Sequence, residues 1–149
     1  MTDQLVADFT LPATGGTTIS LSALRGHPVV LYFYPKDNTP GCTAEAQQFR
    51  DLHPEFTRLG ATVLGVSRDS LKSHENFKAR QSLPFELLSD AEEALCTQFS
   101  VIKLKKLYGK EVRGIERSTF VIDANGKLCR EWRGIKVPGH AQEVLDYVR

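Results

Sequence analysis

Hydrophobic and polar positions follow two periods along the chain, and the change of period marks the predicted elements. Residues 29–34 (VVLYFY) and 61–67 (ATVLGVS) are largely apolar runs, which are typical of strands buried on both faces of a sheet. Between them, large apolar residues recur at steps of three and four, so the pattern predicts an amphipathic helix over about residues 40–59. Gly60 suits the end of that helix, because glycine adopts the left-handed backbone of a helix C-terminus without strain.

Shorter patterns predict the remaining elements. One hairpin is expected around the turn sequence PATGG near the N-terminus, and a second around the sequence ANG. Ser89 and Glu92 form a predicted capping box for a short helix that ends near Phe99. Residues 100–116 are basic and contain glycine, so we expect an irregular loop there. The other predicted bounds, in chain order, are strands 8–11 and 17–21, helix 70–81, strand 85–90, strands 118–123 and 127–133, and a final helix from Ala141 to Val148.

The order of these elements predicts the fold class. It reads ββ, then βαβαβα, then a ββ hairpin and a last helix. Strands that alternate with helices form layered α/β structures, so we expect a central mixed sheet flanked by helices, with the second hairpin at an edge. The chain has 149 residues, which is the size of one domain with its own core, and we assign residues 1–149 to a single domain.

The charge of the chain bears on its partners. Lys and Arg number 19 and Asp and Glu 18, a net charge of +1, so we expect no nucleic acid and no anionic membrane as partner. The basic residues Lys103, Lys105, Lys106 and Lys110 are interpreted as part of a solvated loop, with a binding patch as the alternative. The chain starts without a secretory signal pattern, and its apolar runs are too short to span a membrane, which predicts a soluble, cytoplasmic protein.

The three cysteines are Cys42, Cys96 and Cys129. An odd number at wide spacings is no disulfide framework, and no pair has the C-x-x-C spacing of a cysteine zinc site. Cys42 follows a buried strand within the sequence PKDNTPGCT, residues 35–43. Ligands of open α/β sheets bind at such carboxyl ends of strands, so Cys42 is the candidate for chemistry. A small buried apolar residue near a helix start is the alternative.

Thr39 and Pro40 place Cys42 within the first turn of the predicted helix. Threonine is a preferred N-cap and proline is preferred at the next position, which puts Cys42 at the third helical residue. The helix dipole favours a thiolate there by about 0.3–1 kcal/mol, and at most about 2 kcal/mol. An ordinary thiol needs roughly 3 kcal/mol to be mostly ionised at neutral pH. We therefore expect a cation from elsewhere, and Arg117, immediately before strand 118–123, is the candidate; a surface arginine is the alternative.

The stretch FYPKDNTPGCT resembles the active-site signature P-x-x-x-T-x-x-C of the peroxiredoxins, carried here by Pro35, Thr39 and Cys42. Its sequence is similar to those of the peroxiredoxin Q, or bacterioferritin comigratory protein, subfamily. The similarity extends over nearly the whole chain, through DFTLPATGG, VLGVSRDS, LLSD and RGIERSTFVIDANGK in the same order. The resemblance implies a thioredoxin-like fold with an added N-terminal β-hairpin. It also implies a thiol-dependent peroxidase that reduces hydrogen peroxide and organic hydroperoxides.

The resemblance implies a role for each matching residue. Cys42 would be the peroxidatic cysteine, whose thiolate attacks a peroxide oxygen and becomes sulfenic acid. The Thr39 hydroxyl would hydrogen-bond the thiolate or the peroxide, and Pro35 would shield the sulfur. Arg117 would stabilise the thiolate and polarise the peroxide, while backbone N–H groups near Cys42 stabilise charge on the leaving oxygen. The residues alone leave two simpler interpretations open, a cap for Thr39 and a strand stop for Pro35.

The chain departs from the subfamily at the resolving cysteine. Many members carry that residue five positions after the peroxidatic cysteine, where this chain has Gln47, and others carry it on the next helix, which here has no cysteine. We therefore predict a one-cysteine mechanism, with thioredoxin, glutaredoxin or a small thiol as the external reductant. An atypical two-cysteine mechanism with Cys96 as the resolving residue is the first alternative, and Cys129 is the second. A half-buried structural thiol is the simpler interpretation of both.

Other functions fit the sequence less well. A cysteine hydrolase requires a histidine base, and none of the four histidines lies near Cys42 in sequence. A thioredoxin-type thiol–disulfide oxidoreductase requires C-x-x-C, whose first position is Thr39 here, so exchange would stop at the mixed disulfide. The intact set Pro35, Thr39, Cys42 and Arg117 argues against a non-catalytic module. We expect no metal, haem or flavin cofactor, and a monomer, as is usual in the subfamily.

Overall fold

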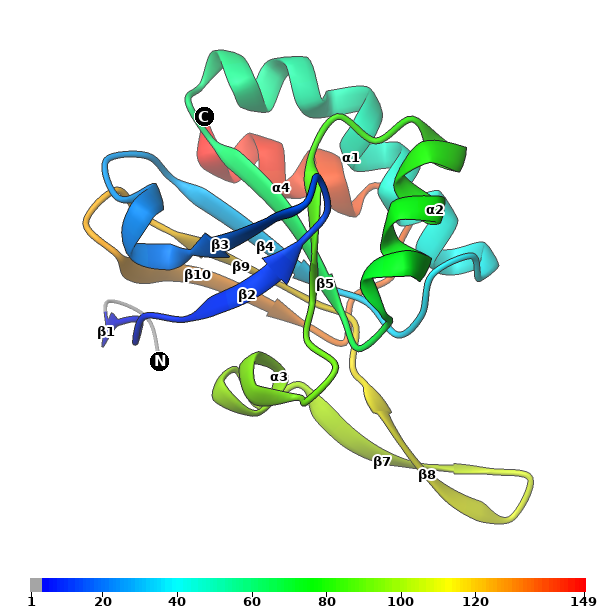
Figure 1. Ribbon diagram of the computed structural model, residues 1–149. Coiled ribbons are helices and arrows are strands. Elements are labelled where there is room, and N and C mark those ends of the chain that lie inside the picture. The colour runs from blue at the N-terminus through cyan, green and yellow to red at the C-terminus, as the bar shows by residue number, and fades with distance from the viewer. Residues whose placement is uncertain (1–3) are drawn as a thin grey trace.

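The structure, a computed structural model, describes residues 4–149, except for the side chains of residues 105 and 107. Within this range one mixed sheet has the strand order β1-β10-β9-β4-β5-β6-β2-β3 (Figure 1). Its strands are β1 (Gln4–Leu5), β2 (Thr10–Ala13), β3 (Thr17–Ser20), β4 (Val29–Phe33), β5 (Thr62–Ser67), β6 (Glu86–Ser89), β9 (Ser118–Ile122) and β10 (Lys127–Arg133).

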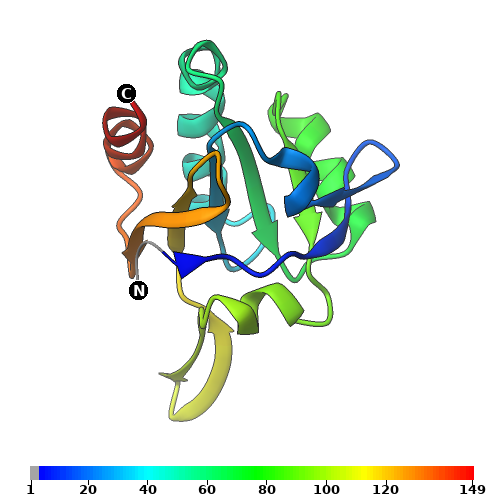
Figure 2. The ribbon, with the colours of Figure 1, turned by 90° about the vertical axis from the view of Figure 1, so that its left-hand side faces the viewer.

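Helices cover both faces of this sheet (Figures 1 and 2). The core on one face includes residues of α1 (Pro40–Arg58), α2 (Leu71–Gln81) and α4 (His140–Val148). The core on the other face includes residues of α3 (Ala94–Gln98) and of the 3-10 helix η1 (Leu21–Leu24). Side chains of β4 alternate between the two cores, so this strand is buried on both sides, as its apolar run predicts.

The neighbours of β4 determine where the site forms. β4 pairs in parallel with β5 on one side and antiparallel with β9 on the other, with Phe33 opposite Ser118. The residue before β9, Arg117, therefore lies at the same edge of the sheet as the loop that follows β4. The strand that starts at Ser118 is thus a direct neighbour of the VVLYFY strand.

The N-terminal hairpin is confirmed. β2 and β3 pair antiparallel around the turn, and β2 joins the main sheet through the pairing of Ala13 with Leu88. β1 was not expected from the sequence; it pairs with β10 at the opposite edge of the sheet. The described part of the chain contains no helix that is long and apolar enough to cross a membrane.

The prediction of an irregular loop over residues 100–116 is wrong. β7 (Ile102–Leu107) and β8 (Lys110–Ile115) form a separate antiparallel hairpin that projects from the body of the protein (Figure 1). Tyr108 and Gly109 both have positive φ, 54° and 78°, which is the backbone of a two-residue hairpin turn. Ile102 and Leu104 alternate with lysines at the start of β7, but the run is short and β8 does not repeat it, so the basic residues obscured the hairpin in the sequence.

The capping box of Ser89 and Glu92 is also wrong. The Ser89 hydroxyl donates to the carbonyl of Asp69 at 2.6 Å, and α3 begins only at Ala94. The carboxylate of Asp90 accepts from the backbone N–H groups of Leu95 and Cys96, at 3.1 and 2.7 Å. A buried acid one residue after Ser89 therefore satisfies the free N–H groups at the start of α3.

A bulge in β10 determines the position of Cys129. A strictly alternating strand places Leu128 and Trp132 on one face and Cys129 on the other. The pairing of β10 with β9 shifts between Leu128 and Arg130, so Leu128 packs in the core with α3, whereas Trp132 packs in the core with α1. Cys129 is half-buried and packs against the same core as Trp132.

Candidate active site

The loop after β4 carries Cys42 into the first turn of α1. Thr39 has the extended backbone of an N-cap, Pro40 is the first helical residue, and Cys42 is the third, as predicted. The predicted side-chain cap is wrong, however. The Thr39 hydroxyl donates to the carbonyl of Lys36 at 2.8 Å and makes no capping hydrogen bond. The hydroxyl therefore braces the loop, and its oxygen keeps its lone pairs for another donor.

Arg117 contacts the sulfur of Cys42. Its Nη2 lies 3.4 Å from Sγ, so the cation expected from the sequence stands beside the thiol. Cys42 is only 1% exposed, and water screens this charge little. A side chain from 75 residues further along the chain thus adds to the effect of the helix start.

Glu45 is a site residue that the sequence reasoning missed. It lies three residues after Cys42 on α1, its side chain is 1% exposed, and its Oε1 accepts from Nη1 of Arg117 at 2.7 Å. One guanidinium therefore bridges the carboxylate and the sulfur. Because residues three apart on a helix share a face, this spacing was a usable signal.

Electrostatics couple these three groups. Burial raises the pKa of Glu45 to about 7, against the opposing pull of the Arg117 charge. Burial also acts against the charge of Arg117, but the negative charges of Glu45 and Cys42 outweigh it and raise the pKa of Arg117. The guanidinium thus stays charged, while the Glu45 carboxyl gains or loses its proton near neutral pH.

Gly41 leaves the room that Arg117 occupies. A Cβ atom at this position would lie 3.1 Å from Nη2 of Arg117, closer than ordinary van der Waals contact. Pro35 is half-buried at the start of the same loop. Its shielding role, like the reactions assigned to Thr39, Cys42 and Arg117, stays a prediction.

The other two cysteines lie away from Arg117. Cys96 is fully buried in the core with α3, on the face of the sheet opposite to Cys42. Burial raises the pKa of the Cys96 thiol far above its ordinary value, and Asp90 adds to the effect, so this thiol is unreactive. The Sγ atom of Cys129 donates to the carbonyl of Val121 at 3.3 Å. Gln47, at the position of the subfamily's resolving cysteine, donates to Gln81 of α2 at 2.9 Å.

The ring nitrogens of His74 and His140 are already bonded and do not supply a base for Cys42. The ring of His74 bonds with Asp37 and Leu88, and that of His140 with Thr119 and Glu143. The geometry therefore does not favour the cysteine hydrolase.

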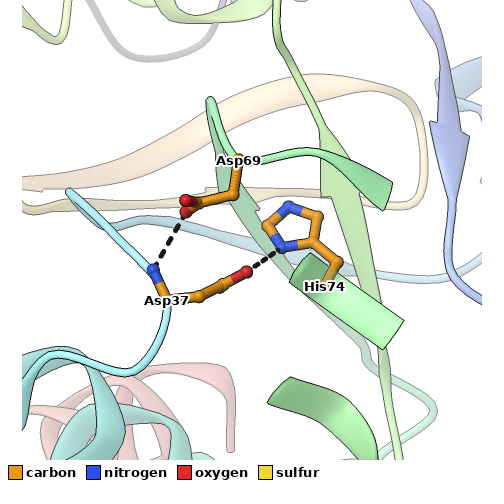
Figure 3. A group of neighbouring side chains, drawn as sticks. All are labelled: Asp37, Asp69 and His74. Carbon is orange, nitrogen blue, oxygen red and sulfur yellow. Dashed lines mark hydrogen bonds and ion pairs between the residues drawn. The ribbon is translucent and has the colours of Figure 1, made fainter. Parts of the chain in front are cut away.

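Asp37, Asp69 and His74 are the one group of described residues close enough together to hold a metal ion (Figure 3). Both ring nitrogens of His74 already bond to protein atoms, and so do both carboxylate oxygens of Asp37. A metal ion requires free lone pairs on these atoms, so the group is an internal hydrogen-bond network and a poor fit to a metal.

A thiol at a helix start, with an arginine beside it, is an arrangement typical of enzymes that work through a thiolate. Comparison with known proteins identifies the family to which this enzyme belongs. The model of the AhpC/TSA family matches residues 2–130. Peroxiredoxin Bcp of Xanthomonas campestris pv. campestris is 54% identical over 151 residues, which cover 97% of this chain and 94% of the relative. Peroxiredoxin Bcp of Bacillus subtilis is 51% identical over 146 residues, covering 98% and 93%.

Solved structures agree with these relatives. A structure of the bacterioferritin comigratory protein of Xanthomonas campestris, from work on its alkyl peroxide reduction activity, matches with a TM-score of 0.90 at 54% identity, over 94% of this chain and 89% of that one. A cysteine variant of Xylella fastidiosa PrxQ matches with a TM-score of 0.95 at 46% identity, over 99% and 94%. The chain belongs to the AhpC/TSA family, as a thiol-dependent peroxidase of the peroxiredoxin Bcp and PrxQ kind with a thioredoxin-like fold.

Proposed function

We propose that Cys42 is the peroxidatic cysteine and that this peroxidase uses a one-cysteine mechanism. The single observation that carries the proposal is the 3.4 Å contact between Arg117 Nη2 and Cys42 Sγ at the start of α1. Hydrogen peroxide and organic hydroperoxides are the proposed substrates, and the alkyl peroxide activity of the Xanthomonas campestris relative supports the second class.

The first step oxidises the sulfur. The Cys42 thiolate attacks one oxygen of the peroxide ROOH, the O–O bond breaks, and the sulfur is oxidised to sulfenic acid, S–OH. The other oxygen leaves as ROH after taking up a proton, or as water when R is hydrogen. Arg117 stabilises the thiolate and then the negative charge on the leaving oxygen, together with backbone N–H groups at the start of α1.

Thr39 and Pro35 position the peroxide in this step. Because the Thr39 hydroxyl gives its hydrogen to the carbonyl of Lys36, we assign its oxygen as an acceptor for the O–H group of the peroxide. This refines the expectation from the resemblance, in which the Thr39 hydroxyl hydrogen-bonds the thiolate or the peroxide. Pro35 shields the sulfur from water.

An external thiol completes the cycle. A first thiol attacks the sulfenic sulfur and releases water, which leaves a mixed disulfide with Cys42. A second thiol then releases the Cys42 thiolate and carries away the disulfide. The placement of Cys96 on the other face of the sheet supports an external reductant over the two-cysteine alternative. Thioredoxin, glutaredoxin and a small thiol are the proposed reductants, and we propose a cytoplasmic monomer.

The test is a steady-state peroxidase assay with hydrogen peroxide and a small dithiol. Cys42→Ser should lose the activity, whereas Cys129→Ser, the matched control, should retain it. Arg117→Lys keeps the charge but cannot bridge Cys42 and Glu45 in the same way, and we expect its rate to fall about a hundredfold. Activity of Cys42→Ser at the wild-type level would refute the proposal.

A further inference from the structure

Asp37 lies in the middle of the loop that joins β4 to α1, two residues before Thr39. Its side chain is 1% exposed and points away from solvent toward His74 of α2, as Figure 3 shows. No role in the peroxidase reaction has so far been given to either residue. Both carboxylate oxygens of Asp37 and both ring nitrogens of His74 make hydrogen bonds within the protein.

Asp37 is held through both its side chain and its backbone. Its Oδ1 accepts from the Tyr34 hydroxyl at 2.6 Å. Its Oδ2 accepts from the Ser73 hydroxyl at 2.8 Å and lies 2.7 Å from Nδ1 of His74. Its backbone N–H donates to the carboxylate of Asp69 at 2.9 Å (Figure 3). The loop before Cys42 is thus tied to the segment that joins β5 to α2.

The hydrogen bonds of His74 determine its protonation. Its Nε2 lies 2.9 Å from the carbonyl oxygen of Leu88, and a carbonyl only accepts, so Nε2 carries a hydrogen. Its Nδ1 faces a carboxylate oxygen of Asp37 that already accepts from Ser73. A carboxylate that receives this many donors is favoured in its ionised form, so Nδ1 carries a hydrogen as well. With a hydrogen on both nitrogens, His74, which is fully buried, would be an imidazolium paired with the Asp37 carboxylate.

The surroundings of the pair are consistent with this charge. The groups that face it are the hydroxyls of Tyr34 and Ser73, the carbonyl of Leu88 and the Asp69 carboxylate on the loop backbone. No second cation is among the hydrogen-bond partners of Asp37 in the described part of the chain, so His74 is its counter-ion. Charge-assisted hydrogen bonds are roughly twice as strong as neutral ones, and a buried pair is screened little by salt.

We propose that Asp37 and His74 are positioning residues for the peroxidase reaction. Their buried ion pair holds the loop of residues 35–39 in the conformation that presents Pro35 and Thr39 to the sulfur of Cys42. Neither residue touches the sulfur; both act through the loop. This inference rests on the proposed function, because it concerns the approach of peroxide to Cys42.

The variant Asp37→Asn removes the negative charge of residue 37 but keeps a side chain that can hydrogen-bond to Tyr34 and His74. The amide can still accept from Tyr34, and its N–H can donate to Nδ1 of a neutral His74, so the loop stays bonded at high pH. When both ring nitrogens of His74 carry hydrogen, the amide must turn its oxygen toward Nδ1, and it has no charge to offset the buried imidazolium, so the loop is held less firmly at low pH. The wild type has no such conflict, because its pair is already charged.

The measurement is the second-order rate constant for oxidation of Cys42 by hydrogen peroxide, followed by stopped flow at several pH values. Both proteins lose thiolate as the pH falls, so the readout is the ratio of the variant to the wild type. We expect this ratio to fall about tenfold or more between about pH 8 and about pH 5.5. Asp51→Asn, an exposed acid on α1, is the matched control and should give a flat ratio.

The protonation of His74 is checked in the unmodified protein. Nitrogen NMR of the histidine rings should show both nitrogens of His74 carrying hydrogen at about pH 7.5, and this test does not depend on the folding of a variant. A neutral His74 ring, or a flat ratio for a folded Asp37→Asn, would overturn the inference. Failure of the proposed function is a separate result, since it is seen as undiminished peroxidase activity in Cys42→Ser.

Discussion

At the scale of single residues, Arg117 contacts two side chains of the site at once and so links Glu45 to Cys42. Its Nη1 bonds to Glu45 at 2.7 Å and its Nη2 lies 3.4 Å from the sulfur of Cys42. The planar guanidinium can hold both in a fixed geometry, which a lysine cannot. The position of the cation therefore depends on Glu45 and on the space that Gly41 leaves free.

Gly41→Ala should lower the rate of Cys42 oxidation without lowering the stability of the protein. The added Cβ comes within 3.1 Å of Nη2 of Arg117, so the guanidinium must move. Alanine favours a helical backbone by about 0.5–1 kcal/mol over glycine, so the thermal midpoint should not fall. The rate of Cys42 oxidation should fall between about tenfold and a hundredfold. Gly114→Ala, where a Cβ meets no atom within 4 Å, is the control. An unchanged rate in Gly41→Ala would show that the added Cβ does not displace the guanidinium from the sulfur of Cys42.

Glu45 should make stability depend on pH. Its pKa is raised from 4.5 to about 7 in the folded protein, so between these values the unfolded chain loses a proton that the folded protein keeps. The free energy of unfolding contributed by Glu45 is therefore greatest below about pH 4.5 and declines as the pH rises to about 7. In Glu45→Gln this decline is absent.

Urea denaturation at about pH 5 and pH 8 measures this effect. The stability of Glu45→Gln relative to the wild type should rise across this interval by up to about 3 kcal/mol. Glu55→Gln, on the same helix but half-exposed, is the control and should show no such change. A difference between Glu45→Gln and the wild type that is the same at both pH values argues against a raised Glu45 pKa.

At the scale of elements, the sheet separates the thiols. Cys42 lies in the first turn of α1 on one face of the sheet, and Cys96 lies in α3 on the other face. Disulfide formation requires Cα atoms within about 7 Å, so a Cys42–Cys96 bridge requires large unfolding. The core position of Cys96 and its raised pKa make it a packing residue.

Cys96→Ala should therefore leave the peroxidase rate unchanged. The loss of one buried sulfur atom should cost roughly 1 kcal/mol of stability. The measurement is the steady-state rate with a small thiol, with the urea midpoint recorded alongside. A rate that collapses in a folded Cys96→Ala protein would support the two-cysteine alternative.

Sequence patterns predicted the elements whose signals are local. The apolar run of β4, the Thr39-Pro40 start of α1 and the turn of the N-terminal hairpin each depend on neighbouring residues, and all three were found. The need for a cation at Cys42 followed from an energy estimate, which indicated Arg117. The β7–β8 hairpin was missed because the short alternation of apolar residues and lysines at the start of β7 is not repeated in β8.

The rest of the site depends on packing between distant elements. Asp37 and His74 are 37 residues apart, and only the approach of α2 to the active-site loop makes them a pair. Neither residue has a local pattern that distinguishes it from a solvated acid or histidine. Glu45 differs, because its spacing of three from Cys42 predicts a shared helix face. Its burial against Arg117 could still not be read from the sequence.

At the scale of the whole molecule, the fold gives the three thiols different surroundings. One stands beside a cation at a helix start, one is sealed in a core, and one is half-buried on β10. Of the three, Cys42 is the thiol that contacts Arg117 at the start of α1, and our proposals assign the peroxide chemistry to it. The central claim is therefore that peroxide oxidises one sulfur and that no other cysteine of the chain resolves it.

Mass spectrometry after one equivalent of hydrogen peroxide, without any reductant, tests this claim most directly. The account predicts a gain of one oxygen confined to the peptide that contains Cys42, with Cys96 and Cys129 still reduced. A protein that has lost two hydrogens and carries a disulfide between Cys42 and Cys96 or Cys129 would contradict it.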